Sequence, residues 1–126
     1  MKTSVMLPIA SLLLIVLFTL HLADDVVLGK DTVNTGGFFT VLAIMTVWLY
    51  GTLMLAGRLL GHLIVLLGSL VGVAVAVLHT MGPQGLHGPY FFVWTLIAIG
   101  GTGAFAFLLA LHALVDLWKS RSGRLG

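Results

Sequence analysis

Four long runs of hydrophobic residues, separated by short polar stretches, make up most of this chain. The runs cover residues 4–23, 38–56, 60–80 and 91–118, and each is long enough to cross the hydrocarbon core of a bilayer as a helix. A helix over residues 5–23 would rise about 29 Å, close to the ~30 Å thickness of that core. The pattern therefore predicts an all-α transmembrane four-helix bundle that forms a single domain over residues 1–126.

The polar stretches between the runs predict short connections. Residues 24–37 are polar and interrupted by glycines, which indicates a loop with room for a short surface helix. The segment MGPQGLHGPY, residues 81–90, contains enough Gly and Pro to break any helix. Short connections make neighbouring helices antiparallel, so we expect an up-down-up-down bundle.

The first run has features of a secretory signal peptide, because Lys2 precedes a hydrophobic stretch. The stretch is long for a signal peptide, however, and His21 stands where a cleavage site needs a small residue. We therefore expect residues 4–23 to be a retained span.

The basic residues predict the orientation. With four spans, only Lys30 falls on one side of the membrane, and the other five basic residues fall on the opposite side: Lys2, Arg58, Lys119, Arg121 and Arg124. The positive-inside rule then puts both termini in the cytoplasm of a protein of the inner (plasma) membrane. In this topology an aromatic belt lies at the inner interface, with Trp118, and another at the outer interface, with Tyr90, Phe91, Phe92 and Trp94.

The composition supports the membrane class and excludes several others. The chain is 60% hydrophobic and 8% charged, whereas about a quarter of the residues of a soluble domain are charged. It has no Cys, so disulfides, thiolate metal sites and thiol catalysis are excluded. A net charge of +2 is too small to indicate nucleic-acid binding.

Small residues on the third run predict how the helices pack. Gly61, Gly68, Gly72 and Ala76 lie on one helical stripe, and such stripes let membrane helices approach closely, within one chain or between copies. The fourth run carries GGTGA, residues 100–104, near its middle. Trp48 and Tyr50 are expected near mid-depth, where their polar atoms need partners, so both should face protein.

A first polar cluster is expected at the outer end of the bundle. Asp24 and Asp25 follow His21 at i+3 and i+4, on one helical face, and His79 closes the third run at the same depth. Together with His87 in the next loop, this set suits Zn²⁺ or another divalent transition metal, or a proton relay. The alternative is structural: Asp24 caps a surface helix, Asp25 pairs with Lys30, and the histidines are solvated.

A second polar cluster is expected at the inner end. Arg58 and His62 are i,i+4 around the second turn, and His112 and Asp116 are i,i+4 near the end of the fourth run. An ion pair between Arg58 and Asp116 is the favoured interpretation, because polar groups at this depth seek each other. Ligation of a b-type haem by His62 and His112 is a further alternative. It is disfavoured because both histidines lie near helix ends.

No pattern in the chain indicates an enzyme. No Ser stands in a nucleophile elbow, and no Gly-rich loop follows a strand to hold phosphate. The short loops leave little room for a substrate pocket outside the bilayer. We therefore expect a non-catalytic integral membrane protein whose partners are the lipid bilayer and either copies of itself or the subunits of a larger membrane complex.

Four segments resemble a known group of proteins: HLADDVV, VWLYGTLMLAGR, LLGSL and FFVWTLIAIGGTG. Together they are similar to small four-span bacterial integral membrane proteins of unassigned function. The resemblance implies the four-span architecture and a bacterial origin. It assigns no activity and no functional residue.

Overall fold

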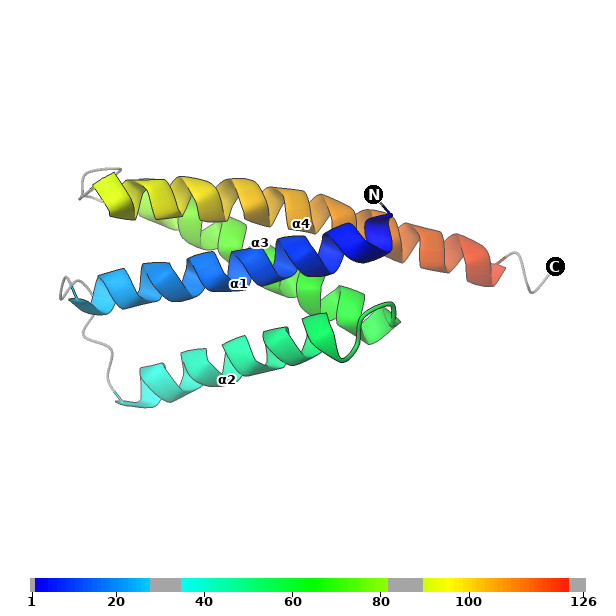
Figure 1. Cartoon of the computed structure of the whole chain (residues 1–126), viewed down its shortest axis with the longest axis horizontal. Coiled ribbons are helices and arrows are strands. Elements are labelled where there is room, and N and C mark those ends of the chain that lie inside the picture. Colours follow the sequence, from blue (N-terminus) through cyan, green and yellow to red (C-terminus); the bar gives the residue numbers. More distant parts are fainter. Residues whose placement is uncertain (1, 28–34, 82–89, 123–126) are drawn as a thin grey trace.

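Four helices make up the described part of the chain, residues 2–27, 35–81 and 90–122 of a computed structural model. They are α1 (Thr3–Val27), α2 (Thr35–Leu53), α3 (Leu59–Met81) and α4 (Tyr90–Ser122). Consecutive helices run in opposite directions, and both chain ends lie at the same end of the bundle (Figure 1). Each helix is long and apolar enough to cross a membrane. The predicted up-down-up-down bundle of four candidate spans is confirmed; which side of a membrane the termini face stays a prediction.

Four helix boundaries differ from the prediction by three or four residues: α2 begins at Thr35 and α4 ends at Ser122, and the ends of α1 and α2 are also shifted. α1 continues through Asp24 and Asp25 to Val27, so the loop expected from residue 24 was wrong for its first four residues, which contain no Gly or Pro to stop the helix. α2 ends at Leu53 rather than at residue 56. The turn that follows places Gly57 at φ +77°, a left-handed conformation that favours glycine.

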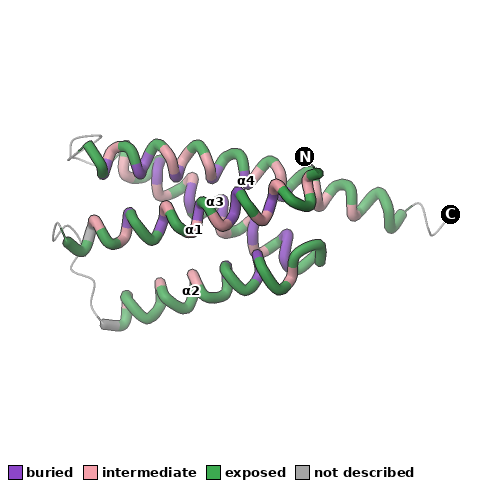
Figure 2. Tube along the Cα trace, in the orientation of Figure 1, coloured by how far each residue is buried: buried purple, intermediate pink, exposed green. Residues whose placement is uncertain are grey.

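The core lies where α1, α3 and α4 face one another (Figure 2). Leu14 from α1 and Ile99 from α4 are both fully buried, at 0% exposure. A Cβ at Gly72 of α3 would lie 3.2 Å from the Leu14 side chain, and one at Gly103 of α4 would lie 3.2 Å from the Ser69 carbonyl oxygen. The predicted role of the small residues in close helix packing is therefore confirmed within the chain.

α2 is packed along only part of its length. None of the residues from Gly36 to Val47 is buried, and the buried residues of this helix, Trp48, Gly51 and Thr52, lie in its last two turns (Figure 2). An apolar groove of about 340 Å³ runs between α2 and α3. The groove is lined by Ala43, Ile44, Val47, Trp48, Ile64, Leu67, Gly68 and Val71.

A closed ring of hydrogen bonds joins the packed end of α2 to α1. The indole N–H of Trp48 donates to the Ser11 hydroxyl (3.1 Å), and the Thr52 hydroxyl donates to the Trp48 carbonyl oxygen (2.9 Å). Ser11 and Thr52 are themselves 2.7 Å apart. Because the one hydrogen of Thr52 goes to Trp48, Ser11 must be the donor in that bond. Each hydroxyl thus donates once and accepts once at a buried position.

The two aromatic residues expected to face protein behave differently. Trp48 is 3% exposed, so that prediction is confirmed. Tyr50 is 55% exposed, so the prediction was wrong for it. Tyr50 is two residues from Trp48 and therefore points to the opposite side of α2. Because α2 ends at Leu53, Tyr50 also lies less than one turn from the end of its helix. A phenol there can keep its ring in lipid and its hydroxyl at the interface.

Candidate functional site

Three rings from three helices meet at the end of the bundle opposite the chain termini. His21 of α1 is 1% exposed, and its ring centroid lies 5.2 Å from that of His79 of α3, with an interplanar angle of 79°. Phe92 of α4 lies 4.8 Å from His21 and 5.9 Å from His79, again between centroids. We call His21 and His79 the histidine pair.

Thr95 connects the His21 ring to α4. The Thr95 hydroxyl donates to the Phe92 carbonyl oxygen (2.9 Å), and its oxygen lies 3.3 Å from Nδ1 of His21. A buried hydroxyl of α4 and a buried imidazole of α1 are thus in polar contact.

His79 is oriented by its own helix. Its Nδ1 lies 2.9 Å from the Val75 carbonyl oxygen, which can only accept, so Nδ1 carries the hydrogen. Nε2 of His79 has no hydrogen-bond partner among the described residues. Nδ1 of each ring in the histidine pair is therefore in contact with a polar group of the bundle, Thr95 for His21 and the Val75 carbonyl oxygen for His79.

The structure brings together only part of the predicted metal-ligand set. Within the described residues, no group of three or more His, Cys, Asp or Glu is close enough to hold a metal ion, so Asp24 does not join the histidine pair as a third ligand. Oδ2 of Asp24 is nevertheless buried, without a hydrogen-bond partner in that part of the chain. The side chain of Asp25, together with His87 and Lys30, lies outside the described residues, so their predicted roles stay predictions.

The sequence did not identify two members of this cluster. Phe92 was assigned to the outer aromatic belt, but it is 4% exposed and packs on the histidine pair, whereas Tyr90, Phe91 and Trp94 are 89%, 55% and 67% exposed. Thr95, three residues further along α4, is 5% exposed. The i,i+3 spacing of Phe92 and Thr95 indicates that both lie on one face of the helix. It does not indicate which of the four aromatic residues faces inward.

The polar residues near the other end do not pair as expected. His112 lies 3.3 Å from Asp116, through Nε2 and Oδ2, with both side chains more than half exposed. Among the described residues, Asp116 makes no ion pair with Arg58, so that prediction was wrong; the i,i+4 neighbour on the same helix is the nearer partner. Haem ligation by His62 and His112 would need both rings to face the bundle interior, so the exposed His112 gives this alternative no support.

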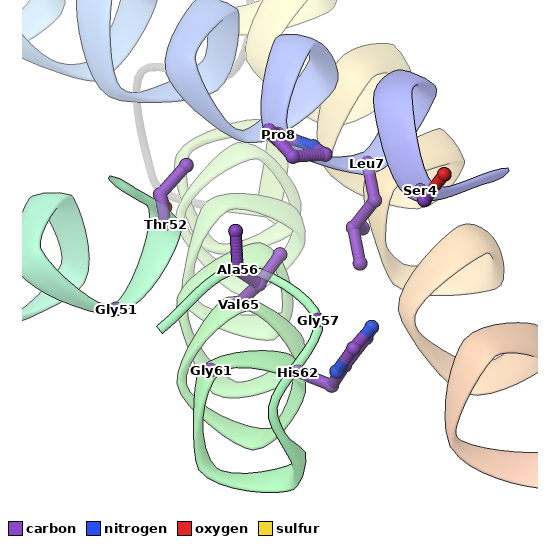
Figure 3. Close-up of a pocket in the computed structure, with 10 residues that line it drawn as sticks. All are labelled: Ser4, Leu7, Pro8, Gly51, Thr52, Ala56, Gly57, Gly61, His62 and Val65. Atoms are coloured by element: carbon purple, nitrogen blue, oxygen red, sulfur yellow. The ribbon is translucent and has the colours of Figure 1, made fainter. Parts of the chain in front are cut away.

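His62 lines a small cavity between the first turns of α1 and the turn from α2 to α3 (Figure 3). Its Nδ1 lies 2.7 Å from the Arg58 carbonyl oxygen, and the ring reaches toward Leu7 (Figure 3). The cavity volume is about 20 Å³, which is room for one water molecule. A pocket of this size cannot accommodate an organic ligand.

Comparisons with protein-family models, with curated proteins and with solved structures found no match for this chain. The predicted resemblance to small four-span bacterial membrane proteins is supported only for the architecture, because the structure has four helices that can span a membrane. Membership of a family and a bacterial origin stay predictions.

Proposed function

We propose that this chain is a non-catalytic multi-pass protein of the inner (plasma) membrane, with both termini in the cytoplasm. It works by associating with other helices in the bilayer, as a homo-oligomer or as an accessory subunit of a larger assembly. The incomplete packing of α2 is the observation that carries this proposal.

The proposal is supported by the contacts that membrane helices need in order to associate. Membrane helices associate through close packing and polar contacts, since lipid removes the hydrophobic driving force between them. α1, α3 and α4 have buried residues over most of their length, whereas the buried residues of α2 are Trp48, Gly51 and Thr52, in its last two turns. The turns from Gly36 to Val47, where no residue is buried, thus offer most of their surface to lipid or to another protein.

The exposed part of α2 offers a shaped surface rather than a smooth one. Phe38 and Phe39 are both more than half exposed, and their rings lie 5.9 Å apart at 73°. The apolar groove between α2 and α3 is lined in part by Trp48 and Gly68, and the Trp48 indole lies against Gly68. A ridge of side chains from another helix could pack into such a groove.

The non-catalytic part of the proposal rests on the sequence. The chain has no Cys, four acidic residues and none of the motifs that position a nucleophile or phosphate. A second candidate function, a metal- or proton-binding membrane protein, is favoured by one observation, the 5.2 Å separation of the His21 and His79 rings.

The absence of native cysteines allows a direct test of α2. Leu42→Cys places a thiol on the exposed part of α2, and Ile97→Cys places a matched thiol on α4. Each position is seven residues after the first residue of its helix. Both native side chains are about half exposed. Each thiol would be labelled with a benzophenone maleimide in native membranes, irradiated, and the adducts identified by mass spectrometry.

The proposal predicts protein adducts, of a second copy or of one constant subunit, at Leu42→Cys and few at Ile97→Cys. Equal yields at the two positions, or lipid adducts alone at both, would contradict it.

A further inference from the structure

We propose that the last turns of α4 bind an anionic phospholipid through Trp118, Lys119 and Ser122. The phosphate of the lipid lies against the Lys119 ammonium and the Ser122 hydroxyl, and an acyl chain lies along the Trp118 indole. This inference goes beyond association through α2, and it depends only on α4 spanning the bilayer.

α4 is long enough to pass through the hydrocarbon core and into the headgroup layer. Its 33 residues correspond to about 50 Å, whereas the core is ~30 Å thick. The excess lies at the end of the bundle that holds both termini, where α4 extends past the other helices (Figure 1). Tyr90 and Trp118 are 89% and 76% exposed, and about 42 Å of helix separates them, which matches a bilayer of about 40–45 Å including its interfaces. Lys119 and Ser122 are then at the level of the lipid phosphates.

The extended end of α4 has a hollow of about 400 Å³ on one face. It is lined by Val115, Trp118, Lys119 and Ser122, so the apolar side chains come first along the helix and the polar ones last. Val115 and Trp118 therefore lie toward the hydrocarbon core, and Lys119 and Ser122 lie toward the aqueous phase. A phospholipid has the same order, because its acyl chains lie in the core and its phosphate lies at the edge.

The polar groups of this hollow are available to a ligand. Asp116 is the carboxylate that the described residues place near it, and Asp116 lies 3.3 Å from His112. The Lys119 ammonium makes no ion pair or hydrogen bond within the described part of the chain, and neither does the Ser122 hydroxyl. Both groups can therefore donate to phosphate oxygens, and the bond from the ammonium is charge-assisted.

Helix dipoles explain only part of the charge at this end of the bundle. A cation is favourable at a helix C-terminus, which accounts for Lys119 and Arg121 in the last turn of α4. Lys2 and Arg58, however, directly precede the first residues of α1 and α3, where the dipole disfavours a cation. An anionic lipid surface offsets this cost, because each basic residue near it strengthens the attraction by about fivefold.

The test uses the exposed indoles at the two ends of α4 as reporters. Trp94→Phe leaves Trp118 as the exposed indole, and Trp118→Phe leaves Trp94, which is 67% exposed near the start of the same helix. The buried Trp48 is common to both proteins. Each protein would be placed in vesicles of phosphatidylglycerol and phosphatidylcholine, with brominated chains on one of the two lipids at a time. Bromine quenches indole fluorescence on contact, so the two quenching values give the preference for the anionic lipid at each end.

We expect Trp118 to prefer phosphatidylglycerol by at least about fivefold, and Trp94 by less than about twofold. In the Trp94→Phe background, Lys119→Gln should lower the preference at Trp118 by about fivefold. Lys2→Gln is the matched control, because it removes the same charge from the start of α1, and it should lower the preference by less than about twofold. Equal quenching of Trp118 by the two lipids, an equal preference at Trp94, or equal effects of Lys119→Gln and Lys2→Gln would each overturn the proposal.

Discussion

The indole nitrogen of Trp48 in α2 donates a hydrogen bond of 3.1 Å to the hydroxyl of Ser11 in α1. This bond belongs to the closed ring that Thr52 completes, so three buried polar groups on two helices satisfy one another. Such mutual satisfaction matters in a bilayer, because lipid offers no alternative partner. The Trp48–Ser11 and Ser11–Thr52 bonds together thus link α1 to the packed end of α2.

Loss of the Ser11 hydroxyl should weaken this link. Ser11→Ala leaves the Trp48 N–H without its acceptor, and we expect a loss of about 1–2 kcal/mol in the free energy of unfolding. The measurement is unfolding in mixed micelles with increasing sodium dodecyl sulfate, followed by circular dichroism. Thr46→Ala is the control: the Thr46 hydroxyl bonds only to a carbonyl of its own helix, at an exposed position, so its loss should change little. Equal effects of the two variants would contradict the assigned role of the ring.

The contact between α2 and α3 should be sensitive to a single methyl group at Gly68. A Cβ there would meet the Trp48 indole, which is a rigid ring held by its bond to Ser11. Gly68→Ala should therefore destabilise the protein by about 1–3 kcal/mol, as overpacking does.

The matched control for that variant is Gly101→Ala. A Cβ at Gly101, also inside a helix, would meet nothing within 4 Å. That variant should be neutral or stabilise the protein by up to about 1 kcal/mol, because Ala is the better helix former. The same unfolding measurement separates the two variants, and a neutral Gly68→Ala would show that the indole does not pack where it is described.

The turn between α2 and α3 depends on the backbone of one glycine. Gly57 has φ +77°, and the space around its missing Cβ is open, so a substitution there acts through backbone strain alone. Gly57→Ala should cost about 1 kcal/mol of unfolding free energy, and Gly57→Asn less, because Asn tolerates the left-handed region. If Ala and Asn behaved alike, another feature of the turn would be responsible.

The sequence predicted the architecture well because length and hydropathy nearly determine it. A run of apolar residues in lipid has to satisfy its own backbone as a helix, so four runs give four helices. Exact ends were harder to predict. The helix passes through Asp24 and Asp25, and α2 stops three residues early, at Leu53, because turn chemistry at Gly57 decides the end rather than hydropathy.

Helix rotation was the property that the sequence could not give. Trp48 and Tyr50 are two residues apart, about 200° around a helix, so they cannot face the same neighbour. Phe92 points inward and its neighbour Phe91 outward for the same reason. In an almost uniformly apolar helix, hydropathy does not select a buried face, so only packing shows that His21 meets His79, Phe92 and Thr95.

The contact between His21 and Thr95 gives a prediction that depends on the second candidate function, metal binding. Thr95→Val keeps the shape of the side chain but removes the hydroxyl that lies 3.3 Å from Nδ1 of His21. Loss of such a partner typically weakens metal binding by about 10–100-fold. Zinc titration of the variant in nanodiscs, with Thr102→Val of the same helix as the control, measures the effect. Unchanged affinity in Thr95→Val would remove Thr95 from the site.

Association through helices in the bilayer is the central claim, and the number of chains per particle tests it most directly. The wild-type chain, fused to one fluorescent protein, would be extracted from native membranes as polymer-bounded nanodiscs. Photobleaching steps would be counted per particle, and the co-isolated subunits would be identified by mass spectrometry. The account predicts particles with two or more copies, or with one copy and a constant second subunit. Particles that hold a single copy and no other protein would contradict it.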